Sequence, residues 1–200
     1  MAFFRPLDVF VIFAGDSMRV KDFIVKEITY GACLSFCQIW HYSKGCPAGK
    51  AYYGLFNGFA IIGVICYGEP AMRNQKTCYD ADIELRRLCC IDDTPKNTES
   101  YFIGKTLKAI KKLGYGTCIS LADPEHGHSG IIYRASNFKY VGRERGGGSR
   151  EIIIDGVKMH SRTAYAKFGV SGYKGLNQMF PDKNIIVRNK ERKHVYLYKL

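Results

Sequence analysis

Apolar and polar positions along the chain follow two periodicities, one typical of strands and one of helices, which together predict a mixed α/β fold. Two β-rich apolar runs in "AYYGLFNGFAIIGVICYG" flank Asn57-Gly58, a strong signal for a tight hairpin. A second hairpin is expected at Asp155-Gly156 within "EIIIDGVKM". Further strands are expected in "VFVIFAG", "DIELRRLCCI", "GTCISLA" and "KYVGRER", and twice in "NIIVRNKERKHVYLYK".

Helical periodicity predicts helices between these strands. "ITYGACLSFCQIWHYS" predicts a buried helix that ends near Trp40. "DDTPKNTESYFIGKTLKAIKKLG" combines a polar first turn, an amphipathic body and two lysines before a stop at Gly114. We expect "GIIYRASNF" to be a helix capped by Ser129, and "RTAYAKFG" to be a shorter one. The order predicts an α/β (α+β) fold with a mixed central sheet flanked by helices.

The "GGGS" at 146–149 is a flexible joint that predicts a division of the chain. We expect a core over 1–145 and a basic, β-rich C-terminal extension over 146–200, packed on the core as one structural domain. No apolar run has the length of a membrane span, and "MAFFRPLDVF" lacks a signal-peptide pattern. We therefore expect a cytoplasmic protein with no membrane partner.

The eight cysteines mostly lie inside apolar runs such as "IIGVICYG" and "LRRLCCI". No CxxC pair is present, which argues against a zinc ribbon and against a redox motif. We expect ordinary buried, reduced thiols.

A net charge of +12 suggests a polyanion as partner. Much of the charge lies in the C-terminal part, interleaved with Tyr and Phe that can stack on bases. The alternative is a basic, solvated surface. The candidates for contacts with DNA phosphates are Lys139, Arg143, Arg145, His160, Arg162, Lys167 and Lys174.

The loop "DDTPKNTES" lies between an expected strand and the start of an expected helix, a position that attracts phosphate. This order of elements resembles the acetyl-coenzyme A-dependent N-acyltransferase (GNAT) fold, in which the pyrophosphate of the cofactor binds the loop after the fourth strand. The usual loop is glycine-rich, whereas this one offers Lys96, Asn97 and Ser100, with glycine only at 104.

A narrower resemblance rests on "WHYS", "ELRRL", "PKNTESYF" and "SLADPEHGHSGIIYRASNFKYVG" in this order. These motifs resemble the Mom family, a divergent GNAT-fold group of DNA-modification proteins. The resemblance implies conversion of adenine in double-stranded DNA to N6-carbamoylmethyladenine, which protects bacteriophage DNA from restriction. Carried over by matching motif, the candidate catalytic residues are Tyr42, Arg87, Ser120, Asp123 and Tyr133.

Each candidate has a plain alternative. Tyr42 positions the base or packs on the sheet, and Arg87 holds substrate or forms a structural ion pair. Asp123 orients or deprotonates the adenine amine, or Asp123-Pro124 is only a turn. Tyr133 lies near the departing group or in the core.

The cluster of Asp123, Glu125, His126 and His128 has the composition of a metal site. A set that draws on His41 and His128 would suit Fe(II). The alternative is that His128 and Ser129 cap the helix start.

The implied chemistry requires an unpaired adenine, because the target amine is paired inside a duplex and the base must be flipped into a pocket. The expected donor is acetyl-CoA or another small acyl or acetamido donor. A carbamoylmethyl group is joined through its methylene, so simple acyl transfer does not give it. Two other classes stay open: an ordinary N-acetyltransferase acting on a protein or small amine, and a non-catalytic DNA-binding protein on a GNAT scaffold.

Overall fold

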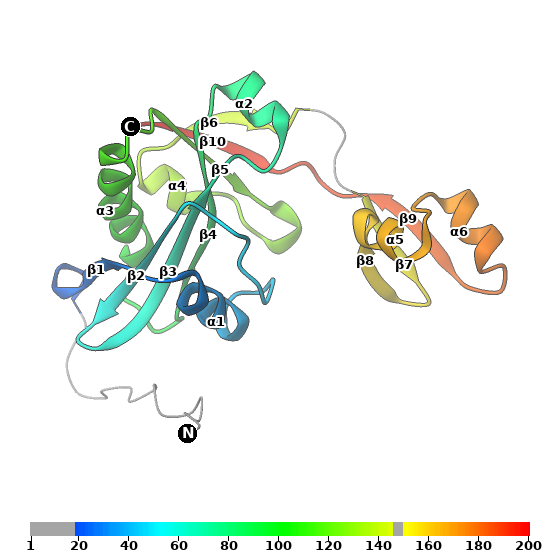
Figure 1. Ribbon diagram of the computed structural model, residues 1–200, viewed down its shortest axis with the longest axis horizontal. Coiled ribbons are helices and arrows are strands. Elements are labelled where there is room, and N and C mark those ends of the chain that lie inside the picture. The colour runs from blue at the N-terminus through cyan, green and yellow to red at the C-terminus, as the bar shows by residue number, and fades with distance from the viewer. Residues whose placement is uncertain (1–18, 146–149) are drawn as a thin grey trace. The chain divides into compact units, whose positions relative to one another are not determined.

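A seven-stranded mixed sheet organises the computed structural model, which describes residues 19–145 and 150–200 (Figure 1). The strand order is β1-β2-β3-β4-β5-β10-β6. Strands β1 to β4 pair antiparallel, and β4 and β5 pair parallel. The strands are β1 (Ile24–Glu27), β2 (Ala51–Asn57), β3 (Ala60–Gly68), β4 (Ile83–Cys90), β5 (Thr117–Ala122), β6 (Lys139–Arg143) and β10 (His194–Lys199). The predicted mixed central sheet is confirmed.

Helices cover both faces of this sheet. Side chains alternate along β3, so Val64 and Cys66 pack with α1, while the Tyr67 hydroxyl contacts Thr106 of α3 at 2.8 Å. Helices α1 and α3 therefore lie on opposite faces (Figure 1). The helical elements here are η1 (Val20–Asp22), α1 (Tyr30–Trp40), α2 (Arg73–Tyr79), α3 (Thr98–Lys112) and α4 (Ile131–Ala135).

A smaller three-stranded sheet, of order β8-β7-β9, has a core of its own. The core consists of Ile152, Ile154, Ala164, Leu176 and Ile185. The elements are β7 (Arg150–Ile154), β8 (Val157–His160), α5 (Ser161–Phe168), α6 (Tyr173–Met179) and β9 (Ile185–Asn189).

The chain divides into two compact units. Of the described residues, the first comprises 19–121, 130–140 and 196–200, and the second comprises 122–129, 141–145 and 150–195. The expectation of a 1–145 core with a packed 146–200 extension stays a prediction. Within the described residues, no helix is both long enough and apolar enough to cross a membrane.

Most local predictions are confirmed. The first hairpin turns at Gly58 with a φ of 58°, and the second turns at Asp155 and Gly156 with φ of 49° and 83°. The prediction that Ser129 caps α4 is wrong. Gly130, with a φ of 75°, is the N-cap, and no side chain hydrogen-bonds there. The expected strand "VFVIFAG" lies outside the described residues.

Candidate active site

A buried pair of hydroxyl groups lies between β5 and α4 in the first unit. The parallel pairing of β4 with β5 sets Ser120 opposite Leu85, and the Ser120 hydroxyl donates to the Leu85 carbonyl at 3.4 Å. Ser120 is fully buried and hydrogen-bonds Tyr133 of α4. The Tyr133 ring packs on Phe138 and Tyr196, with centroids 5.7 Å and 5.4 Å away. The packing fixes the phenol on the Ser120 side chain.

Burial determines the protonation of this pair. It raises the pKa of Tyr133 to about 12, against the opposing effect of the hydrogen bond between Tyr133 and Ser120. The phenol therefore keeps its proton near neutral pH. Tyr133 is suited to donate a hydrogen bond or a proton, and is unsuited to act as a base.

Tyr42 is the exposed member of the group. It follows His41, the C-cap of α1, and the two rings lie 4.3 Å apart between centroids. Half of its surface (52%) is exposed, and it lies within electrostatic range of the Tyr133 phenol. The structure thus brings Ser120 and Tyr133 into contact, two of the five residues carried over from the motifs, with Tyr42 within that range.

Arg87 supports the segment that carries Tyr42. From the middle of β4, its Nε donates to the Gly45 carbonyl at 3.2 Å, and its Nη1 donates to the Arg86 carbonyl at 2.7 Å. The bond to Gly45 joins β4 to the irregular segment 41–50, whereas the bond to Arg86 stays within β4. In the structure, Arg87 therefore holds this segment. A contact between Arg87 and substrate stays a prediction.

Asp123 belongs to the second unit and forms a turn, which was the plain alternative for it. It is the N-cap of η2 (Pro124–His126), where its carboxylate accepts from the Glu125 backbone N–H at 3.1 Å. Its Oδ2 lies 3.6 Å from the Lys193 Nζ. A catalytic role for Asp123 stays a prediction.

The histidines that suggested a metal site have other surroundings. His41 is buried, and its Nδ1 lies 2.8 Å from the Ser43 hydroxyl. His126 and His128 are exposed in the second unit, with ring centroids 6.4 Å apart. Over residues 19–145 and 150–200, the one group of three or more potential ligands close enough for a metal ion is a set of buried cysteines. Nothing in the described chain supports the Fe(II) site.

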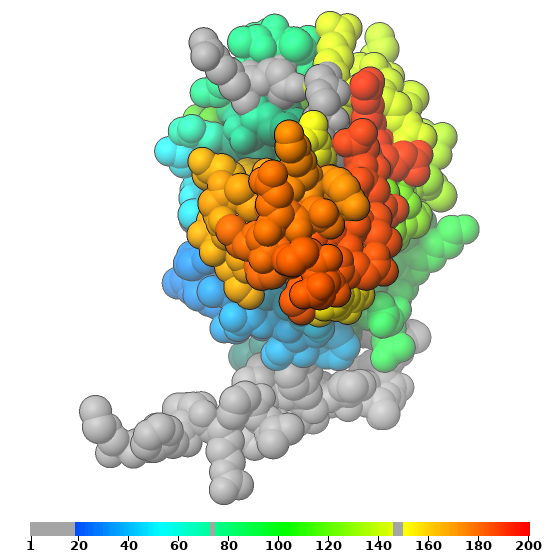
Figure 2. Space-filling model, turned by 90° about the vertical axis from the view of Figure 1, so that its right-hand side faces the viewer, coloured from blue at the N-terminus to red at the C-terminus, as the bar shows by residue number. Residues whose placement is uncertain are grey.

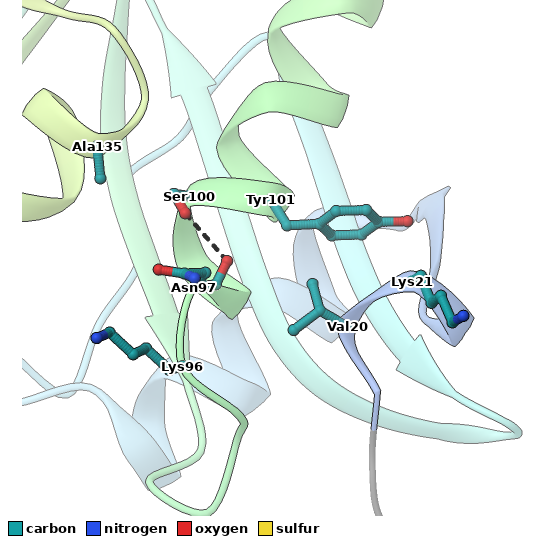
Figure 3. A pocket seen from close by; sticks show the side chains of 7 residues that line it. All are labelled: Val20, Lys21, Lys96, Asn97, Ser100, Tyr101 and Ala135. Carbon is teal, nitrogen blue, oxygen red and sulfur yellow. Dashed lines mark hydrogen bonds between the residues drawn. The ribbon is translucent and has the colours of Figure 1, made fainter.

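A pocket of about 470 Å³ opens at the start of α3 (Figure 3). The three residues predicted for the cofactor lie together there: Lys96, Asn97 and Ser100. Asn97 is the N-cap with a φ of 71°, and the Ser100 hydroxyl donates to its carbonyl at 3.0 Å. The other lining residues are Val20, Lys21, Tyr101 and Ala135.

This pocket has the charge of an anion site. Two lysines and the positive end of a fifteen-residue helix favour negative groups, although Glu99 lies in the first turn. Lys21 escaped the sequence reasoning because it belongs to η1, far from "DDTPKNTES" in the chain. No local motif signals that contact.

The candidates for phosphate contacts differ in their surroundings. Lys139 is exposed on β6 of the first unit, and Arg145 is exposed in the second. Arg143 pairs with Glu191 at 2.7 Å. Arg162, Lys167 and Lys174 are exposed on α5 and α6, which are orange in Figure 2.

His160 is a weak candidate for binding phosphate. It is the N-cap of α5, where its Nδ1 accepts from the Arg162 backbone N–H at 3.0 Å. Burial, together with the charges of Arg162, Lys190 and Lys193, lowers its pKa. The ring is therefore neutral at pH 7 and brings no charge to a phosphate.

Comparison with known proteins gives this arrangement its family. The model of the Mom protein family matches residues 22–200. The chain belongs to that family. A relative, the methylcarbamoylase Mom of Escherichia phage Mu, is 30% identical over 155 residues, which are 73% of this chain and 63% of that protein. The matched part is thus less than two thirds of the phage protein's length.

Solved structures place this Mom-family chain in the GNAT fold. A polyamine N-acetyltransferase of Drosophila melanogaster has a TM-score of 0.51 at 9% identity, covering 90% of this chain and all of that one. The acetyltransferase yncA of Salmonella typhimurium, solved with acetyl-CoA, also has a TM-score of 0.51, at 8% identity over 90% of this chain and 94% of its own. The predicted GNAT-like architecture is confirmed.

Proposed function

We propose that this Mom-family chain is a transferase that converts adenine in DNA to N6-carbamoylmethyladenine and thereby protects bacteriophage DNA from restriction. The observation that carries the proposal is the buried Ser120–Tyr133 hydroxyl pair beside Tyr42, in a chain similar to the phage Mu methylcarbamoylase. A fixed, neutral phenol is the kind of group that donates a proton or a hydrogen bond to a departing group.

The roles follow from the chemistry of each group. Tyr133, oriented by Ser120, donates its proton to the group that departs from the methylene carbon. Tyr42 is exposed and close by, so its ring is available to stack on a flipped adenine. Asp123 accepts the proton of the adenine amine. Arg87 keeps the Tyr42 segment in place and offers a guanidinium for the carbonyl.

The pocket at the start of α3 is the proposed site for the anionic part of the donor. Lys21, Lys96 and the helix N-terminus fit the phosphates of acetyl-CoA, the cofactor with which the Salmonella enzyme was solved. Acetyl transfer would join nitrogen to an acyl carbon, whereas the carbamoylmethyl group is joined through a methylene. The donor must therefore be an acetamido compound with a leaving group on its methylene carbon. The bond to that group breaks as the adenine nitrogen attacks, and the departing group takes the bonding electrons.

Double-stranded DNA is the proposed macromolecular partner. The second unit carries twelve Lys and Arg against seven Asp and Glu. Exposed cations of this kind bind phosphates without regard to sequence and weaken with salt.

Ser120→Ala tests the catalytic proposal with a small change. DNA from bacteria that express the native chain should resist restriction at sites containing adenine, and DNA from the variant should be cut. Ser136→Ala is the matched control, because Ser136 is also buried, on the C-cap of α4, and its hydroxyl bonds the Ile132 carbonyl at 2.7 Å. Resistance that persists in Ser120→Ala at equal protein level would contradict the role of the hydroxyl pair.

A further inference from the structure

Four cysteine thiols converge beside α1, from three separate parts of the first unit. Cys33 and Cys37 are four residues apart and share one face of α1. Cys46 lies in the irregular segment 41–50, and Cys66 lies in β3. All four are buried. A helix, an irregular segment and a strand thus bring cysteine thiols together in one buried region.

The spacing of the sulfurs matches that of ligands around a metal ion. The Sγ atoms of Cys33 and Cys46 are 3.5 Å apart, and those of Cys33, Cys37 and Cys46 all lie within 4.8 Å of one another. The Cys66 thiol adjoins this group of three, because it and the Cys46 thiol both approach the Pro47 carbonyl, at 3.6 Å and 3.5 Å. A tetrahedral zinc ion with Zn–S bonds of about 2.3 Å holds its sulfurs roughly 3.8 Å apart.

The cluster differs from the other buried thiols in its sulfur–sulfur contact. Cys118 and Cys89 hydrogen-bond the carbonyl of the next residue, at 3.7 Å and 4.0 Å. Cys46 and Cys66 also approach carbonyls in this way, at 3.5 Å and 3.9 Å, but the Cys46 sulfur additionally lies 3.5 Å from that of Cys33. A thiol is a weak hydrogen-bond donor, whereas a thiolate is a strong metal ligand. One shared cation would therefore satisfy four clustered sulfurs better than hydrogen bonds between them would.

Positive charge lies beside the cluster. Arg86 and Arg87 of β4 donate to the carbonyls of Ala48 and Gly45, in the same segment as Cys46. Metal binding requires deprotonated thiols, and nearby cations offset the negative charge of a tetrathiolate site.

We propose that Cys33, Cys37, Cys46 and Cys66 bind one zinc ion, which fixes the segment that carries His41 and Tyr42. The segment has ten residues without helix or strand. Arg86 and Arg87 hold it only through the carbonyls of Ala48 and Gly45. A chain of this size has a core large enough to fold without metal, so the zinc acts locally on Tyr42. The soft thiolate set favours zinc over the harder oxygen-seeking ions.

Metal analysis of the full-length, tag-free protein is the direct test. Inductively coupled plasma mass spectrometry should find one zinc per chain. After exchange for Co(II), the protein should show intense thiolate-to-metal charge transfer and the strong d–d bands of a tetrahedral site. Metal-free protein with eight titratable thiols would overturn the proposal. So would a Cys33–Cys46 disulfide found by peptide mapping, or iron in place of zinc.

Substitutions assign the ligands. Cys46→Ser should lose the zinc, whereas Cys89→Ser should retain it, because Cys89 packs in the same cluster without joining the thiol contacts. If Cys46→Ser fails to fold, release of zinc from the native chain by a thiol-blocking reagent gives the same information. Four thiols should be protected from the reagent until a chelator removes the ion. Equal reactivity of all buried thiols in the holoprotein would contradict the site. None of these readouts depends on the proposed DNA chemistry.

Discussion

Tyr133→Phe separates the chemistry of the buried phenol from its packing. The substitution removes only the hydroxyl, while the ring keeps its contacts with Phe138 and Tyr196. One hydrogen bond to Ser120 is lost, which costs about 0.5–1.5 kcal/mol. This loss is small beside the roughly 5–15 kcal/mol of a folded domain, so the variant should stay folded.

The effect on the reaction should be much larger. Removal of a positioned proton donor lowers the rate by about 10²–10⁴-fold. The assay is the rate at which modified deoxyadenosine accumulates after induction, measured by nucleoside mass spectrometry and normalised to soluble protein. A rate within about twofold of the native chain corresponds to less than 0.5 kcal/mol and would refute the role of Tyr133 as donor.

The same variant has a predicted pH signature. Burial raises the pKa of Tyr133 from 10.0 to about 12, so its contribution to stability is complete below pH 10 and is lost as the pH rises toward 12. At 1.36 kcal/mol per unit, the loss is roughly 3 kcal/mol. Denaturant titrations should show the native chain more stable than Tyr133→Phe below pH 10 and less stable than it near pH 12. A constant difference between the two would contradict the buried, protonated phenol.

Three further changes test other parts of the account. Asp123→Asn should abolish modification yet change the free energy of unfolding by less than about 1 kcal/mol, because its partner Lys193 is partly exposed; a surviving mark would remove Asp123 from the mechanism. Lys96→Glu should weaken coenzyme A binding about tenfold in calorimetry, whereas Lys108→Glu, further along α3, should not; equal affinities would place the donor elsewhere. Glutamate at Arg162, Lys167 and Lys174 together should reduce the slope of log affinity for DNA against log salt by about 0.9 per lost phosphate contact, and an unchanged slope would exclude these residues from the interface.

Local sequence patterns predicted the turns and helices whose formation depends on neighbouring residues. The turn at Asp155-Gly156 formed because both residues tolerate positive φ, and α3 formed between a polar first turn and a stop at Gly114. Ser120 could be identified from a sequence motif because the residues around it in the motif also lie next to it on β5.

Contacts between distant segments could not be predicted in this way. Lys21 joins the pocket of Lys96 from another element, and Cys46 and Cys66 meet the α1 cysteines only after the sheet has formed. The absence of a CxxC pair did not reveal this cluster, because the two cysteines on α1 are four residues apart. The Ser129 cap failed because Gly130, with a φ of 75°, occupies the N-cap.

Nucleoside mass spectrometry of DNA from bacteria that express the chain tests the central claim most directly. The account predicts a deoxyadenosine in which carbamoylmethyl replaces one hydrogen, with fragmentation that places the group on the base, and no such species from the Ser120→Ala strain. Unmodified deoxyadenosine beside abundant soluble protein would contradict it. Acetyl in place of carbamoylmethyl would instead identify an ordinary acyl transfer on this fold.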